Sequence, residues 1–138
     1  MLDTEAKQAI LDRVSKIPIY NTLKMEIVSL EDKSCEVRVP RDLKYDGVFE
    51  SFHGGLLMTV ADSTACFAIM TRTSPDMRLT TTDMNIRFLA PCLSDLTARA
   101  RVIKMGRSLC PVAVDMFDAH QTQVAVAQVT YILLGAAK

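Results

Sequence analysis

Near the start of the chain, apolar residues recur at three- and four-residue steps, which places them on one face of a helix. The positions are Ala6, Ile10, Val14 and Ile17. Thr4 can cap this helix through its hydroxyl. Pro18 ends the pattern, because the residue before a proline is pushed out of the helical conformation. We therefore predict a short N-terminal helix within residues 1–17.

The pattern then changes to a period of two, which is typical of half-buried β-strands. Residues 23–39 alternate on both sides of a polar turn and predict a hairpin. Further alternation predicts later strands over residues 84–88, 96–102, 112–116 and 124–134. Successive strands joined by short loops pair antiparallel. Pro111 has no N–H to donate, so we expect it on an edge strand or at a bulge.

Residues 55–73 are apolar on nearly every side and carry one charge before Arg72. At about 1.5 Å per residue their length suits a helix better than a strand. A helix that is apolar all round is a buried helix. The sequence therefore predicts an α+β fold, in which a curved antiparallel sheet wraps around one long central helix. We expect one domain over residues 1–138.

Composition narrows the function classes. The 138 residues include 16 basic and 16 acidic ones, and the pI is near 6.7. A neutral chain lacks the charge that holds a nucleic acid or an anionic membrane, so we expect neither as a partner. The first residues show no leader pattern, and no apolar run reaches the roughly 18 residues of a membrane span, which predicts a cytoplasmic protein. The four cysteines match no zinc-ligand spacing, so we expect reduced thiols and no metal.

Asp62 is anomalous in the central helix, because its neighbours include Val60 and Phe67. An ionised carboxylate in apolar surroundings costs several kcal/mol unless a partner compensates for the lost water. A carboxylate retained in such a place can act as a general base. The alternative is that Asp62 points to solvent, or is held by a hydroxyl such as that of Thr59 or Ser63.

Gly54 and Gly55 stand at the start of the same helix, where the first N–H groups have no intrahelical acceptor. Such amides suit a phosphate, a carboxylate or a developing oxyanion, although a tight loop entering a packed helix is the alternative. Gly54 and Asp62 are about 12 Å apart along a helix, too far for one reacting carbon to contact both. We therefore expect Asp62 of one copy to meet Gly54 of another in a two-fold homodimer. We also expect such dimers to pair into a dimer of dimers, although the spacing itself does not distinguish a dimer from a tetramer.

Taken together, these motifs resemble the hotdog-fold acyl-CoA thioesterases, in the branch of the phenylacetyl-CoA thioesterases. The segment HGGLLMTVADSTA is similar to the start of that family's central helix. Further similarities lie at residues 45–47, 80–85, 88–91, 106–108, 124–125 and 130–131. The resemblance covers residues 23–134, which is nearly the whole chain.

The resemblance implies roles for individual residues. The backbone N–H groups of Gly54 and Gly55 would polarise the thioester carbonyl as an oxyanion hole. Asp62 of the partner copy would activate a water or attack directly, and Thr81 matches a hydroxyl that orients this water. The implied substrate-binding residues are His53, Gly47 and Arg107.

The chain departs from the family at two positions. Gly47 stands where many relatives carry an amide side chain that polarises the carbonyl, and Glu50 stands where a small residue is frequent. Both departures leave open which class of substrate the protein accepts and how efficient its catalysis is. The candidate groups for the phosphates of coenzyme A are Arg107, Lys104, Arg99 and Arg101, although a solvated strand face also explains the last two.

The sequence thus predicts a dimeric acyl-CoA thioesterase that needs no metal and no redox cofactor. Two other functions stay open on the same scaffold. A hydratase or dehydratase would use a histidine together with a carboxylate, and His53 is the histidine near the helix. A non-catalytic acyl-CoA binding or sensor protein would use the same pocket without turnover.

Overall fold

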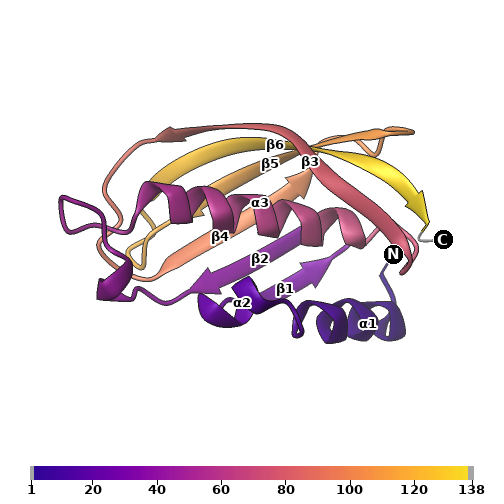
Figure 1. Ribbon diagram of the computed structural model, residues 1–138, viewed down its shortest axis with the longest axis horizontal. Coiled ribbons are helices and arrows are strands. Elements are labelled where there is room, and N and C mark those ends of the chain that lie inside the picture. The colour runs from indigo at the N-terminus through magenta and orange to yellow at the C-terminus, as the bar shows by residue number, and fades with distance from the viewer. Residues whose placement is uncertain (1, 137–138) are drawn as a thin grey trace.

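The computed structural model describes residues 2–136. As the sequence predicted, a curved antiparallel sheet wraps around one long helix (Figure 1). The helices are α1 (Thr4–Val14), α2 (Pro18–Thr22) and α3 (Gly54–Met70), with a 3₁₀ turn, η1, at Leu43–Tyr45. The strands are β1 (Glu26–Glu31), β2 (Ser34–Val39), β3 (Met77–Phe88), β4 (Leu96–Val102), β5 (Leu109–Phe117) and β6 (Gln123–Ala136).

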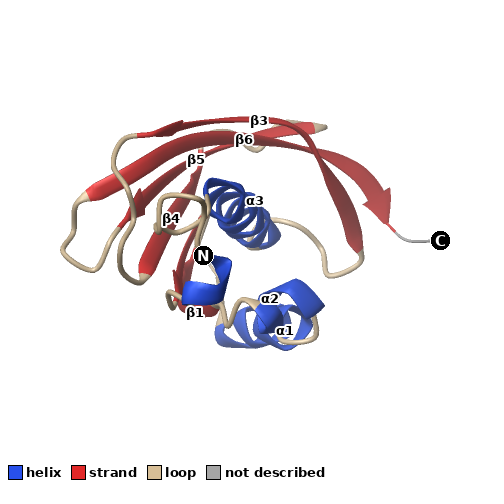
Figure 2. Ribbon diagram, turned by 60° about the vertical axis from the view of Figure 1, so that its left-hand side comes forward, coloured by secondary structure: helices blue, strands red, loops and turns tan. Residues whose placement is uncertain are grey.

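The sheet has six strands in the order β1-β2-β4-β5-β6-β3. Among the described residues β3 pairs only with β6, so its other edge is unpaired. The register between these two strands shifts twice, between Arg78 and Leu79 and between Thr81 and Asp83. Irregularities of this kind bend a strand and increase its twist. Figure 2 shows β3 and β6 arching over α3, with α1 and α2 at the β1 end of the sheet.

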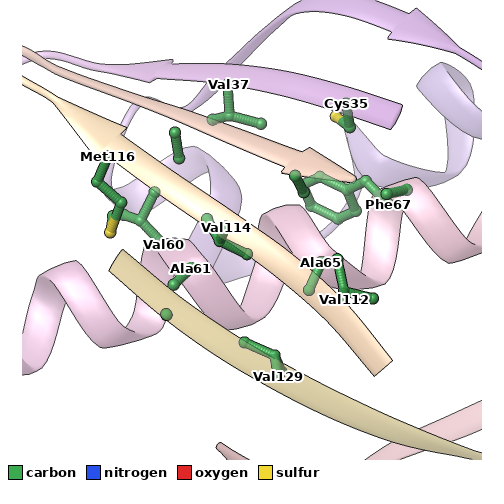
Figure 3. Packing of buried hydrophobic residues seen from close by; sticks show 14 of the residues in the cluster. Cys35, Val37, Val60, Ala61, Ala65, Phe67, Val112, Val114, Met116 and Val129 are labelled. Atoms are coloured by element: carbon green, nitrogen blue, oxygen red, sulfur yellow. The ribbon is translucent and has the colours of Figure 1, made fainter. Parts of the chain in front are cut away.

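Small apolar side chains allow α3 to lie close to the concave face of the sheet. Val60, Ala61 and Ala65 of the helix have no exposed surface. Buried strand residues around them include Val114 and Val129, whose side chains point toward the helix (Figure 3). Because such interiors are close-packed, the position of α3 against the sheet is fixed, and so is the position of any functional group on it.

The N-terminal segment differs from the prediction in its cap and in its length. Asp3, and not Thr4, caps α1, because the Asp3 carboxylate accepts the N–H of Ala6 at 2.7 Å. The helix ends at Val14, and Pro18 begins a second short helix that the pattern did not predict. A proline is well suited to a first helical turn, where no N–H is needed.

The central helix ends a turn earlier than the apolar run suggests. Residues 55–73 were expected to be helical, whereas α3 ends at Met70. The hydroxyl of Thr71 donates to the carbonyl of Ala68 at 2.7 Å and accepts the N–H of Lys33 at 2.9 Å. This pair of bonds ties the end of α3 to the turn between β1 and β2.

The expectation for Pro111 was wrong, since the residue lies in β5, a strand with neighbours on both sides. The pairing of β5 with β4 begins at Val112, the residue after Pro111, so Pro111 lies outside it. The carbonyl of Pro111 accepts the N–H of Ile103 at 2.8 Å, beyond the end of β4. The N–H that Pro111 lacks would therefore lie at the end of the β4–β5 pairing, where its absence costs little stability.

None of the helices in residues 2–136 is long and apolar enough to cross a membrane. All four cysteines are free, and Cys35, Cys92 and Cys110 are buried. Within the same residues, no group of three or more His, Cys, Asp or Glu side chains could hold a metal ion.

An ion pair between Arg72 and Asp32 gives a testable pH dependence. The guanidinium donates to both carboxylate oxygens, at 2.5 and 2.7 Å, and lowers the pKa of Asp32 below its ordinary 3.8. A lowered pKa in the folded state contributes stability above the ordinary value, and that contribution is lost as the pH falls through the folded-state pKa. We expect the urea midpoint of the wild type to fall more steeply below pH 3.8 than that of Arg72→Leu. Parallel profiles for the two proteins would contradict this assignment.

Candidate active site

His53 caps the N-terminus of α3 and determines which amides there are free. Its Nδ1 accepts the N–H of Gly55 at 2.9 Å. The N–H of Gly54 has no acceptor among residues 2–136. Of the two glycine amides implied by the resemblance, only that of Gly54 is thus available to a ligand. The ring of Phe88 packs against Gly54, with its Cζ 3.3 Å from the place where a Cβ would stand.

The loop before α3 is held by Arg41, a residue that the sequence did not single out. The guanidinium donates to the carboxylate of Asp46, with the shorter contact at 2.6 Å, and to the carbonyl of Glu50 at 2.8 Å. Glu50 has a φ of +59°, a left-handed backbone conformation that glycine adopts more readily than glutamate. Gly47 lies against the ring of His53, where an added Cβ would stand 3.8 Å from Cδ2.

Asp62 lies in the middle of α3 and is held by two hydroxyls from the sheet. Thr81 of β3 donates to Oδ1 at 2.7 Å, and Tyr131 of β6 donates to the same atom at 2.9 Å. The side chain is half-buried, and the hydroxyls that hold it come from the sheet and not from Thr59 or Ser63. Oδ2 accepts no hydrogen bond from the described residues, and it is not buried. One carboxylate oxygen is therefore fixed and the other is open.

The groups around this carboxylate are neutral. Burial raises the pKa of the Tyr131 phenol above its ordinary value of 10.0, so the hydroxyl keeps its proton. Burial likewise raises the pKa of Cys66, one helical turn beyond Asp62, to about 11. Both groups therefore keep their protons at neutral pH.

The predicted residues fall into two clusters along one helix, and one residue lies apart. His53, Gly54 and Gly47 gather at the start of α3, whereas Asp62 and Thr81 meet about 12 Å farther along its axis. Arg107 is exposed in the loop between β4 and β5. Within one chain, the structure therefore does not bring the two clusters together.

Tyr131 is the residue that sequence reasoning missed as part of the site. The segment that contains it matched the last strand of the family, but no role followed from the match. Its register does identify it, because Tyr131 pairs with Thr81 across β6 and β3. A tyrosine that faces the candidate hydroxyl of Thr81 can be identified only once the pairing of β3 with β6 is known.

A curved six-stranded antiparallel sheet around one long helix is the hotdog fold. Two solved structures share it closely. The Escherichia coli PaaI protein of the phenylacetic acid degradation operon matches with a TM-score of 0.89, 21% identity and 99% coverage of both chains. A thioesterase family protein of Silicibacter pomeroyi matches with a TM-score of 0.88, 23% identity, and coverage of 95% of this chain and 99% of that one.

The chain belongs to the family described as a domain of unknown function, DUF4442, whose profile matches residues 7–133. Among curated proteins it is similar to acyl-coenzyme A thioesterase 13 of Mus musculus. The two are 26% identical over 121 residues, which cover 82% of this chain and 83% of the mouse protein.

Proposed function

We propose that this protein is an acyl-CoA thioesterase in which Asp62 is the base or nucleophile and the N–H of Gly54 binds the oxyanion. One observation carries the proposal: a carboxylate in a mostly buried helix is fixed through Oδ1 and has Oδ2 open. The free N–H of Gly54 at the start of the same helix would supply the hydrogen bond that polarises the thioester carbonyl. The mouse relative supports an acyl-CoA substrate.

Asp62 and the N–H of Gly54 act on one thioester when they come from two different copies of the chain. A two-fold axis across α3 would set the two helices antiparallel and bring Gly54 of one protomer near Asp62 of its partner. The unpaired edge of β3, the strand that carries Thr81, lies open for such an association. A dimer built this way has two equivalent sites, and two such dimers would associate into a dimer of dimers.

The reaction then needs no group beyond these. Oδ2 of Asp62 accepts a proton from a water, and the water oxygen attacks the thioester carbon. The carbonyl oxygen takes the electron pair and accepts a hydrogen bond from Gly54 N–H. The tetrahedral intermediate collapses, the C–S bond breaks, and the thiolate takes the proton from Asp62. In the nucleophilic variant, Oδ2 attacks the carbon itself and the C–S bond breaks, which releases the thiolate and leaves an anhydride. Water then cleaves the anhydride, which frees the carboxylic acid and Asp62, and the proton lost from the water goes to the thiolate.

Basic groups for the phosphates of coenzyme A belong to this proposal as well. Arg107 and Lys104 are exposed on the loop between β4 and β5 and form no ion pair within residues 2–136. Arg99 is a weaker candidate, because its guanidinium pairs with Glu36 and stacks on the ring of Phe117 at 4.7 Å.

A panel of acyl-CoA thioesters with straight, branched and aromatic acyl groups tests the proposal. We expect release of free thiol, detected with a chromogenic thiol reagent, from at least one member at rates typical of enzymes. Tight acyl-CoA binding without thiol release would instead indicate a binding or sensor protein. Hydration of an enoyl-CoA, followed by loss of its absorbance, would indicate a hydratase.

A further inference from the structure

The register of β3 and β6 delivers two hydroxyls to one atom of the site. Thr81 and Tyr131 are paired residues of neighbouring strands. Both donate to Oδ1 of Asp62, at 2.7 and 2.9 Å. The single proton of the Tyr131 hydroxyl is shared with the backbone carbonyl oxygen of Asp62, which also lies at 2.9 Å. The tyrosine thus spans the side chain and the backbone of the same helical residue.

Two donors on one oxygen determine how the carboxylate is turned. The terminal torsion of an aspartate is broad and two-fold, so nothing within the side chain fixes which oxygen faces the substrate. With Oδ1 held by both hydroxyls, Oδ2 is the atom presented outward. Thr81 is half-buried, whereas Tyr131 is only 6% exposed. The tyrosine is therefore the better shielded of the two constraints.

Apolar packing alone does not explain the hydroxyl of Tyr131. Its neighbours along the inner face of β6 include Val129, which is fully buried and apolar. A phenylalanine would fill the same volume without a polar atom to satisfy. A buried hydroxyl needs a partner, and the acceptors in reach are the two oxygens of Asp62.

We propose that Tyr131 is a positioning residue for the thioesterase reaction, which holds Oδ1 of Asp62 so that Oδ2 faces the water or the thioester. This inference rests on the proposed function. Tyr131 itself does not touch the reacting atoms. Its phenol keeps its proton throughout, because burial raises its pKa, so it acts as a fixed donor and transfers no proton.

Tyr131→Phe removes this oxygen and nothing else. We expect kcat to fall about ten- to a hundred-fold, the range for a lost hydrogen bond to a charged group, with KM changed less than about three-fold. Tyr20→Phe is the matched control. It removes a hydroxyl that accepts the N–H of Ile27 at 3.1 Å, away from Asp62, and kcat should stay at the wild-type value.

The same change in an Asp62→Asn background separates positioning from structure. If Tyr131 acts through the carboxylate, Tyr131→Phe should change the residual turnover less than about two-fold there, because coupled residues are not additive. A ten-fold loss in both backgrounds, or an equal loss for Tyr20→Phe, would overturn the inference and leave the proposed function standing. A wild type that releases no thiol from any acyl-CoA would overturn the proposed function, and this inference with it.

Discussion

Replacing Asp62 with asparagine is expected to lower kcat by about a hundred- to ten-thousand-fold, the range supplied by a positioned base. The change keeps the shape of the side chain. The amide oxygen of asparagine can accept the hydroxyls of Thr81 and Tyr131 as Oδ1 does now. The amide nitrogen would replace Oδ2, however, and it can neither take a proton from water nor attack a carbonyl.

Thiol release measures this effect, and urea unfolding confirms that the variant is folded. Asp12→Asn is the matched control, because Asp12 is an exposed helical aspartate of α1, away from the β3 edge. Its turnover should equal that of the wild type. Turnover of Asp62→Asn within a few-fold of the wild type would remove Asp62 from the mechanism, whatever the fold.

Two inactive variants are expected to restore activity when they are mixed, and this is the second large effect. Gly54→Pro removes the free N–H, and it suits the backbone there: Gly54 is the first helical residue, and His53 before it has a ψ of 128°. Loss of one oxyanion donor costs about a hundred- to a thousand-fold in kcat. Gly54→Ala is the control, because it keeps the N–H and makes the same close approach to Phe88.

Complementation follows from the shared site. In a mixed dimer of Asp62→Asn and Gly54→Pro chains, one site combines the intact Asp62 of one chain with the intact Gly54 of the other. The second site carries both changes. If equal amounts of the chains are unfolded and refolded together, half of the dimers are mixed, and about a quarter of the wild-type activity should return. Activity no higher than the sum of the separate variants would show that the site is not shared between copies.

Much of the fold could be predicted from local patterns. The alternation of Leu96, Ala98, Ala100 and Val102 corresponds to β4, because each side chain there faces either the core or solvent. The apolar run of α3 is equally direct, because a segment without a polar face has to be buried. The cap at Asp3 and the place of Pro111 were not predictable in this way. Both depend on which backbone groups have neighbours, and a local pattern does not record that.

The residues of the candidate site also differ in whether a local sequence pattern identifies them. Asp62 could be singled out because a carboxylate in an apolar helix violates the expected pattern. Tyr131 could not, because a tyrosine fits the apolar face of a strand without conflict. Its contact with Asp62 depends on the register of β6 against β3, which shifts twice along its length. Arg41 was missed for a similar reason, since its partners, from Asp46 to the carbonyl of Leu93, converge only in the folded chain.

The open edge of β3 has a consequence for how this protein survives in a crowded solution. A strand of 12 residues with one row of backbone groups unpaired is a template for misassembly with any other extended chain. Arg78, Asp83 and Arg87 place charges along it, which discourages indiscriminate stacking. If a second copy covers this edge, assembly would protect the protein from aggregation in the same step that completes its chemistry, and dilution would endanger both together.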